Sequence, residues 1–100
     1  MKVTVVWTPE AEQDRLDIWD FIALDNPLAA SRMDVLFSEA ANRLATHPEL
    51  GKRGRVHDTR ELIPHKSYRL VYQIVEETIW VLALVHTAQH WPPLFIKDDD

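Results

Sequence analysis

The chain has 100 residues and no cysteine, so it is long enough for one domain with a modest core and has neither disulfides nor thiolate metal sites. Apolar residues make up 46% and charged residues 27%, which is typical of a globular protein and excludes a disordered one. The formal net charge of −5 argues against a domain devoted to nucleic acid, because such domains are usually basic as a whole.

From its sequence, the N-terminus is not expected to be a targeting signal. Residues 1–7 are followed by Thr-Pro-Glu-Ala-Glu, which does not fit a signal peptide. No apolar run approaches the roughly 18–20 residues that a bilayer span requires. We therefore expect a cytoplasmic protein with no membrane partner.

A strand and a helix open the chain. Residues 3–7 are β-branched or aromatic and predict a strand. Thr8 is then a helix N-cap, with Pro9 in the first turn and Glu10 near the positive end of the helix dipole. Apolar residues at three- and four-residue spacings predict an amphipathic helix over residues 11–23.

A second helix follows almost without a linker. Asn26 and Pro27 end the first helix and cap the second. Its apolar face begins at Ala29, and it ends near residues 46–48. Two long helices with so short a connection must fold back as a hairpin.

The second half of the chain reads as a loop and three strands. Residues 48–58 contain both glycines and predict the loop, and β-type runs follow at 59–63, 68–75 and 78–85. Residues 76–77 make the last two runs a hairpin. The order β-α-α-β-β-β predicts an α+β fold: an N-terminal strand and an antiparallel two-helix hairpin packed on an antiparallel β-sheet. We expect one domain over residues 1–93 and a flexible tail over 94–100.

Positive charge is concentrated in one segment. Residues 52–69 hold six basic residues against two acidic ones, whereas the flanking segments are acidic. Such a cluster is usually a solvated loop, but four of the six bases are arginines, which favours a surface that meets an anion or an acidic partner.

In this order and spacing, several short motifs together resemble the RelE/ParE superfamily of toxins from bacterial type II toxin–antitoxin modules. They are Thr-Pro-Glu-Ala-Glu at 8–12, Asp-Ile-Trp-Asp-Phe-Ile at 17–22, His-Pro at 47–48, Thr-Arg-Glu-Leu at 59–62, Tyr-Arg-Leu-Val-Tyr at 68–72, and a last strand ending in His86 with Trp-Pro at 91–92. The resemblance covers residues 1–93.

The resemblance implies one of two activities. RelE-like members cut mRNA on the ribosome, whereas ParE-like members poison DNA gyrase and lack the nuclease residues. In both groups an antitoxin wraps a segment across the toxin, and the pair represses its own operon, so the toxin meets DNA only through the antitoxin. For this chain the resemblance favours the ParE-like activity, with a ribbon-helix-helix, ParD-like antitoxin. The ribosome-dependent nuclease remains the alternative.

Nuclease chemistry needs cations for the developing phosphorane charge and a general base and acid. Arg60 and Arg69 suit phosphate clamps, and His86 or His90 suits the base or acid. However, nuclease members end in a tyrosine or a histidine–tyrosine pair, which is missing here. Ala88 and Gln89 also stand where the nearest relatives of this pattern carry arginine.

Each basic residue also has a structural interpretation. Arg60 and Glu61 could form cross-strand ion pairs, and Arg69 could bind an acidic group of the antitoxin or of the first helix. His86 and His90 have the i, i+4 spacing of a metal-binding helix, but no third ligand is evident, so we expect neither metal nor cofactor.

Two sets of contact residues are therefore predicted. The target would contact the basic segment through Arg53, Arg55, Arg60 and Arg69. The antitoxin would contact apolar residues outside the main helical stripes, together with one strand tyrosine: Phe21, Leu28, Val35 and Tyr72.

Overall fold

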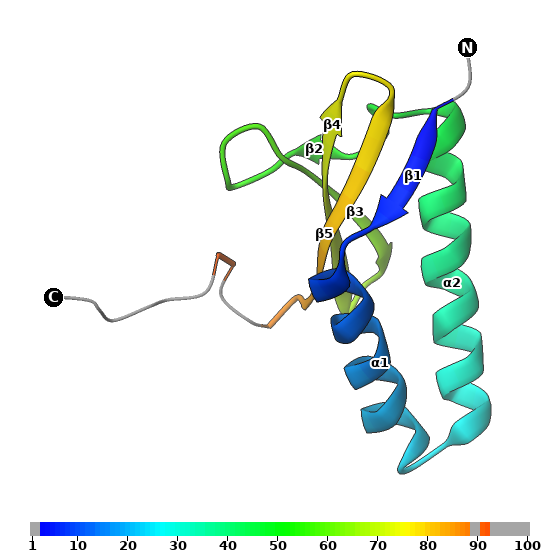
Figure 1. The fold of residues 1–100 in the computed structure, drawn as a ribbon. Helices are drawn as coiled ribbons and strands as arrows, with labels where there is room; N and C mark the ends of the chain where they lie inside the picture. The colour runs from blue at the N-terminus through cyan, green and yellow to red at the C-terminus, as the bar shows by residue number, and fades with distance from the viewer. Residues whose placement is uncertain (1–2, 89–90, 93–100) are drawn as a thin grey trace, which may run out of the picture.

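The computed structural model describes residues 3–88 and 91–92. The predicted tail at 94–100 and the predicted roles of Gln89 and His90 lie outside these residues. The elements in chain order are β1 (Thr4–Trp7), α1 (Pro9–Ala23), α2 (Pro27–Thr46), β2 (Lys52–Arg53), β3 (Arg60–His65), β4 (Tyr68–Val75) and β5 (Thr78–His86). The predicted α+β fold, with its two-helix hairpin against a sheet, is confirmed (Figure 1).

Both helices begin at the capping residues that the sequence predicts. The Thr8 hydroxyl accepts a hydrogen bond from the Ala11 N–H at 3.2 Å. The Asn26 side chain accepts one from the Ala29 N–H at 3.1 Å. Each bond satisfies a backbone donor that the first helical turn leaves without a partner.

The sheet is mixed, which corrects the prediction of a wholly antiparallel one. Its strand order is β1-β5-β4-β3-β2, and β1 lies parallel to β5 while the other pairs are antiparallel. Thr8 fixes this arrangement, because its N–H donates to the Val81 carbonyl at 3.0 Å and its hydroxyl to the same carbonyl at 2.9 Å. The expected loop at 48–58 also contains the short strand β2, which pairs with the start of β3.

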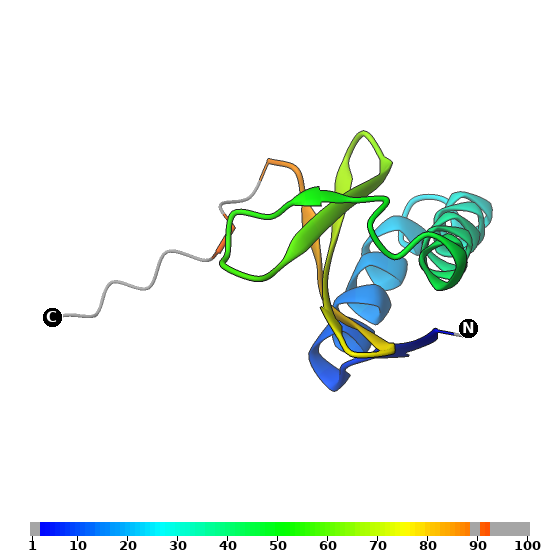
Figure 2. The same cartoon turned by 90° about the horizontal axis from the view of Figure 1, so that it is seen from above.

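The two helices cover one face of the sheet (Figure 2). The core between them is centred on Phe37, Leu44, Leu70, Tyr72 and Val81, all nearly or fully buried. The opposite face has a smaller apolar cluster of Val71, Ala83 and Val85, against which Trp91 packs. β5 is thus apolar on both faces because it is a central strand, as its sequence predicts.

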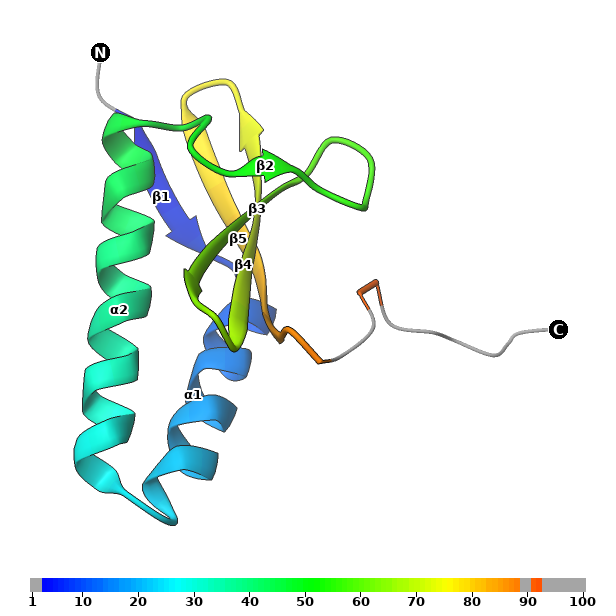
Figure 3. The ribbon, with the colours of Figure 1, turned by 180° about the vertical axis from the view of Figure 1, so that it is seen from behind.

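The tip of the helical hairpin extends beyond the sheet, whereas the loop between β2 and β3 projects from the side away from α2 (Figures 1 and 3). No helix in the part of the chain that the structure describes is long and apolar enough to cross a membrane.

Candidate functional site

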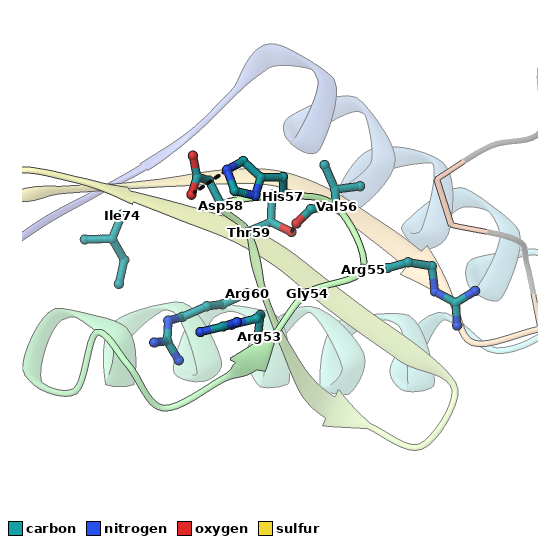
Figure 4. A pocket seen from close by; sticks show the side chains of 9 residues that line it. All are labelled: Arg53, Gly54, Arg55, Val56, His57, Asp58, Thr59, Arg60 and Ile74. Carbon is teal, nitrogen blue, oxygen red and sulfur yellow. Dashed lines mark hydrogen bonds and ion pairs between the residues drawn. The ribbon is translucent and has the colours of Figure 1, made fainter.

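A cavity of about 600 Å³ lies in the loop between β2 and β3 (Figure 4). It is lined by residues 53–60, which are part of the basic segment, and by Ile74 of β4. Part of the basic segment therefore lines a cavity.

Close backbone contacts give the loop its shape. The Gly54 N–H donates to the Thr59 carbonyl at 2.7 Å, and the buried Thr59 hydroxyl donates to the Val56 carbonyl at 2.6 Å. A Cβ at Gly54 would lie 2.3 Å from the Thr59 hydroxyl oxygen, so only glycine fits there without a shift. Asp58 closes the turn with a φ of 64°, a conformation that aspartate tolerates better than most residues.

Arg53 and Arg60 come together on this cavity. They are directly opposite each other in the β2–β3 pair, and Figure 4 shows both side chains extending in the same direction. Arg60 is held by its own hydrogen bonds, since Nη1 donates to the Gly51 carbonyl at 2.8 Å and to the Glu49 carbonyl at 3.4 Å.

The other two predicted target-binding arginines are not part of this pair, although Arg55 also lines the cavity. Arg55 points away from the Arg53–Arg60 pair (Figure 4). Arg69 lies on the sheet face opposite the helices, as strand alternation predicts, and its Nη1 donates to Glu61 Oε1 at 3.1 Å. Glu61 Oε2 also accepts from the Arg55 N–H at 3.0 Å, so one carboxylate links β3, β4 and the loop.

His86 does not meet Arg69, although a nuclease site would need the two residues together. His86 is opposite Tyr68 in the β4–β5 register, and the two rings contact edge to face with centroids 5.2 Å apart. Neighbouring residues of a strand point to opposite faces, so His86 shares a face with Tyr68 and not with Arg69.

Arg60 is also remote from His86. It is opposite Tyr72, four residues along β4 from Tyr68, which corresponds to roughly 13 Å at about 3.3 Å per residue. The three residues expected to form a nuclease site, Arg60, Arg69 and His86, are therefore not brought together. Among the described residues, no group of three or more His, Cys, Asp or Glu side chains could hold a metal ion.

Three of the four predicted antitoxin-binding residues are accessible on the helical hairpin. Phe21 is 73% exposed, Leu28 60% and Val35 51%, and the last two share a face of α2 because they are seven residues apart. Leu16, Trp19 and Leu24 are also exposed, which the helical pattern did not predict.

Tyr72 is not available to a partner, which corrects that prediction. It is fully buried, and its hydroxyl donates to the Pro48 carbonyl at 2.7 Å and accepts from the Gly51 N–H at 2.9 Å. Burial raises the pKa of this phenol, while the Gly51 N–H and the nearby Arg60 charge act in the opposite direction. Tyr72 therefore fastens the segment before β2 to the core.

Comparison with known proteins agrees with this geometry. Residues 5–91 match the family described as the ParE toxin of the type II toxin–antitoxin system parDE. Toxin RelE2 of Caulobacter vibrioides is 34% identical over 85 residues, which cover 85% of this chain and 96% of that protein.

Two solved structures share the fold. The chromosomal ParDE toxin–antitoxin system of P. aeruginosa matches with a TM-score of 0.74 at 19% identity, covering 84% of this chain and 95% of that chain. The toxin–antitoxin complex RelBE2 of Mycobacterium tuberculosis matches with a TM-score of 0.65 at 25% identity, covering 86% of this chain and 99% of that chain.

Proposed function

Because this chain belongs to the ParE toxin family of type II toxin–antitoxin systems, we propose that it inhibits growth by poisoning DNA gyrase and that a cognate antitoxin neutralises it. The proposed setting is the cytoplasm, where gyrase and the antitoxin are both present. Toxicity in this scheme requires no cofactor.

A protein target is favoured by the separation of the candidate nuclease residues. A nuclease must bring its base, its acid and its phosphate clamp to one scissile bond. Here Arg69 and His86 lie on opposite faces of the sheet, and Arg69 is engaged by Glu61. The net charge of −5 is a second argument, because it opposes the approach of a long polyanion.

The target is proposed to contact the basic segment. Arg53 and Arg60 line one cationic cavity. Arg55 adds positive charge in the β2–β3 loop, and Arg69 adds it on the sheet face opposite the helices. These four residues do not form a single row, so they suit the irregular surface of a protein better than a nucleic-acid backbone.

The antitoxin is proposed to cover the exposed apolar residues of the helical hairpin, with Phe21, Leu28 and Val35 among its contacts. Exposed apolar side chains of this size mark interaction surfaces when several lie close together. The solved relatives described as toxin–antitoxin systems support such a partner. A ribbon-helix-helix antitoxin would supply the DNA contact of the complex.

One observation supports the alternative of a ribosome-dependent mRNA nuclease. The relative that is 34% identical is named RelE2, and the complex that matches at 25% identity is named RelBE2. In this alternative, groups of the ribosome or the mRNA would have to complete the site, because Arg60, Arg69 and His86 do not form one by themselves.

Parallel assays of the purified toxin distinguish the two functions. Gyrase is incubated with supercoiled DNA and toxin, and programmed ribosomes are incubated with mRNA and toxin. We expect gyrase-dependent DNA cleavage and no cleavage of ribosome-bound mRNA. Strong mRNA cutting that is lost in Arg69→Lys would establish the nuclease instead.

A further inference from the structure

Arg53 and Arg60 face each other directly across the β2–β3 pair. Like charges in this position destabilise a strand pair. Among the described residues the ion pairs are Arg15–Asp34, His57–Asp58 and Arg69–Glu61, so neither guanidinium has a carboxylate partner. An arrangement that costs stability and lacks an internal counter-charge is the kind that a binding site retains.

Arg60 is positioned before any ligand arrives. Both of its hydrogen bonds to described residues start from Nη1, so Nε and Nη2 have no partner there. The Arg53 side chain, which makes no hydrogen bond to a described residue, extends beside it (Figure 4). One fixed and one adjustable guanidinium can together bind the two oxygens of a single carboxylate.

The walls of the cavity suit an acidic side chain. Val56 and Ile74 line it together with the arginines, and their apolar surfaces can contact the methylene groups of a glutamate. Asp58, the acidic residue of the lining, has Oδ1 3.4 Å from His57 Nε2, and the two form an ion pair when His57 is protonated. A nucleic acid would instead require a row of cations at the spacing of its phosphates. The Arg55 side chain points away from Arg53 and Arg60, and Arg69 lies on the sheet face opposite the helices. These four arginines therefore form no such row.

We propose that the Arg53–Arg60 cavity binds an acidic peptide segment, with one glutamate or aspartate carboxylate held between the two guanidinium groups. This rests on the proposed target-binding role of the basic segment and names the chemistry that the segment recognises. The occupant is a protein, and the recognised feature is a carboxylate.

The test measures binding of a short fluorescein-labelled oligoglutamate peptide to the full chain by fluorescence anisotropy at low salt. We expect Arg53→Gln and Arg60→Gln each to weaken binding at least tenfold, since each removes a charge-assisted contact. Lys52→Gln is the matched control, because Lys52 is the neighbour of Arg53 on β2 and is opposite Glu61, on the other face. It should change the affinity less than twofold.

Arg53→Gln keeps the test independent of folding, because the Arg53 side chain makes no hydrogen bond or ion pair with the described residues. Its melting temperature should be no lower than that of the parent, since the change also removes the like-charge repulsion across the β2–β3 pair. A parent that does not bind the peptide, or a Lys52→Gln protein that loses as much affinity as Arg53→Gln, overturns the proposal. So does a labelled single-stranded RNA that binds more tightly than the peptide and depends on Arg53.

The gyrase assay is read separately. A protein that binds the peptide through Arg53 and Arg60 but does not poison gyrase supports the cavity and contradicts the proposed function. A protein that poisons gyrase but does not bind the peptide contradicts the cavity alone.

Discussion

Glu61 connects two basic residues that the sequence places far apart. One oxygen accepts from Arg69 of β4 and the other from the backbone N–H of Arg55. Both side chains of the Arg69–Glu61 ion pair are largely buried, with 17% and 13% of their surface exposed. Because a buried charge without its partner is costly, the pair holds the loop against the sheet.

Replacing Arg69 by lysine tests whether Arg69 acts through its ion pair with Glu61 or through contact with the target. Lysine keeps the charge and can pair with Glu61, so we expect Arg69→Lys to fold and to bind its antitoxin. Toxicity should fall, because the guanidinium fork is lost. Growth after induction and co-purification with the antitoxin measure the two effects. If Glu61→Gln reduces toxicity equally, Arg69 acts by positioning the loop and not by touching the target.

Tyr72→Phe should loosen the segment before β2. The change leaves the Gly51 N–H and the Pro48 carbonyl without the bonds at 2.9 and 2.7 Å, at a cost of about 1–3 kcal/mol. Tyr68→Phe is the control, because the Tyr68 hydroxyl makes no hydrogen bond to a described residue. Thermal unfolding should show a clearly lower melting temperature for Tyr72→Phe only. Equal effects would mean that ring packing, and not the hydroxyl, fastens the segment.

Asp14 makes stability depend on pH. Burial raises the pKa of its carboxyl, the Leu84 N–H at 3.1 Å opposes this, and the nearby charges of Asp17 and Glu10 add to it. A raised pKa means that the folded state binds the proton more tightly than the unfolded state does. The contribution of Asp14 therefore lowers stability as pH rises from its unfolded pKa of 3.8 through the folded one.

Asp14→Asn should remove this dependence and still accept a hydrogen bond from Leu84. We expect the variant to be at least as stable as the parent at pH 7, with an advantage that shrinks as the pH falls toward 4. Urea unfolding across this range measures it. Asp20→Asn, an exposed acid of the same helix, should show no comparable trend. A Leu84 amide that exchanges faster in Asp14→Asn would show that the hydrogen bond was lost as well.

At the scale of elements, the helices and strands were predictable because their signals are local. Thr8 and Asn26 act within three residues of themselves, and the apolar alternation of β5 reflects its two buried faces. β2 has only two residues, too few for a pattern, and β1 gives no local sign that its partner is β5.

The candidate site was predictable only in part for the same reason. Alternation along β4 placed Arg69 on the correct face. The face of His86 depends on its register with Tyr68, which is a contact between strands. The structural interpretation gave Arg60 and Glu61 cross-strand ion pairs. Glu61 forms one, with Arg69 across the β3–β4 pair, whereas Arg60 donates to the Gly51 and Glu49 carbonyls instead.

The prediction about the antitoxin rests on exposed apolar residues of the helical hairpin. Leu28 and Val35 are mostly exposed, so Leu28→Ser with Val35→Ser should change the melting temperature little. Affinity for the antitoxin should fall at least tenfold if these residues are contacts. Val75→Ser is the control, since Val75 is also exposed but lies at the β4–β5 turn, at the opposite end of the molecule from the hairpin tip (Figure 1). Unchanged affinity in the double variant would move the antitoxin surface elsewhere.

On the scale of the whole molecule, the proposed contact surfaces occupy separate regions. The exposed apolar residues lie on the hairpin, and the Arg53–Arg60 cavity lies in the loop that projects away from α2 (Figure 3). Direct blocking by an antitoxin on the hairpin would therefore require a segment that reaches across the sheet.

The pairing of β1 with β5 also has a consequence for the synthesis of the toxin. Thr4 meets Thr78, so the first strand cannot complete the sheet until 74 further residues have been made. At about 5–20 residues per second, that interval is roughly 4–15 s. We expect nascent chains stalled before β5 to be cut rapidly by protease and finished chains to resist. We therefore expect the chain to acquire toxicity only after its last strand has left the ribosome.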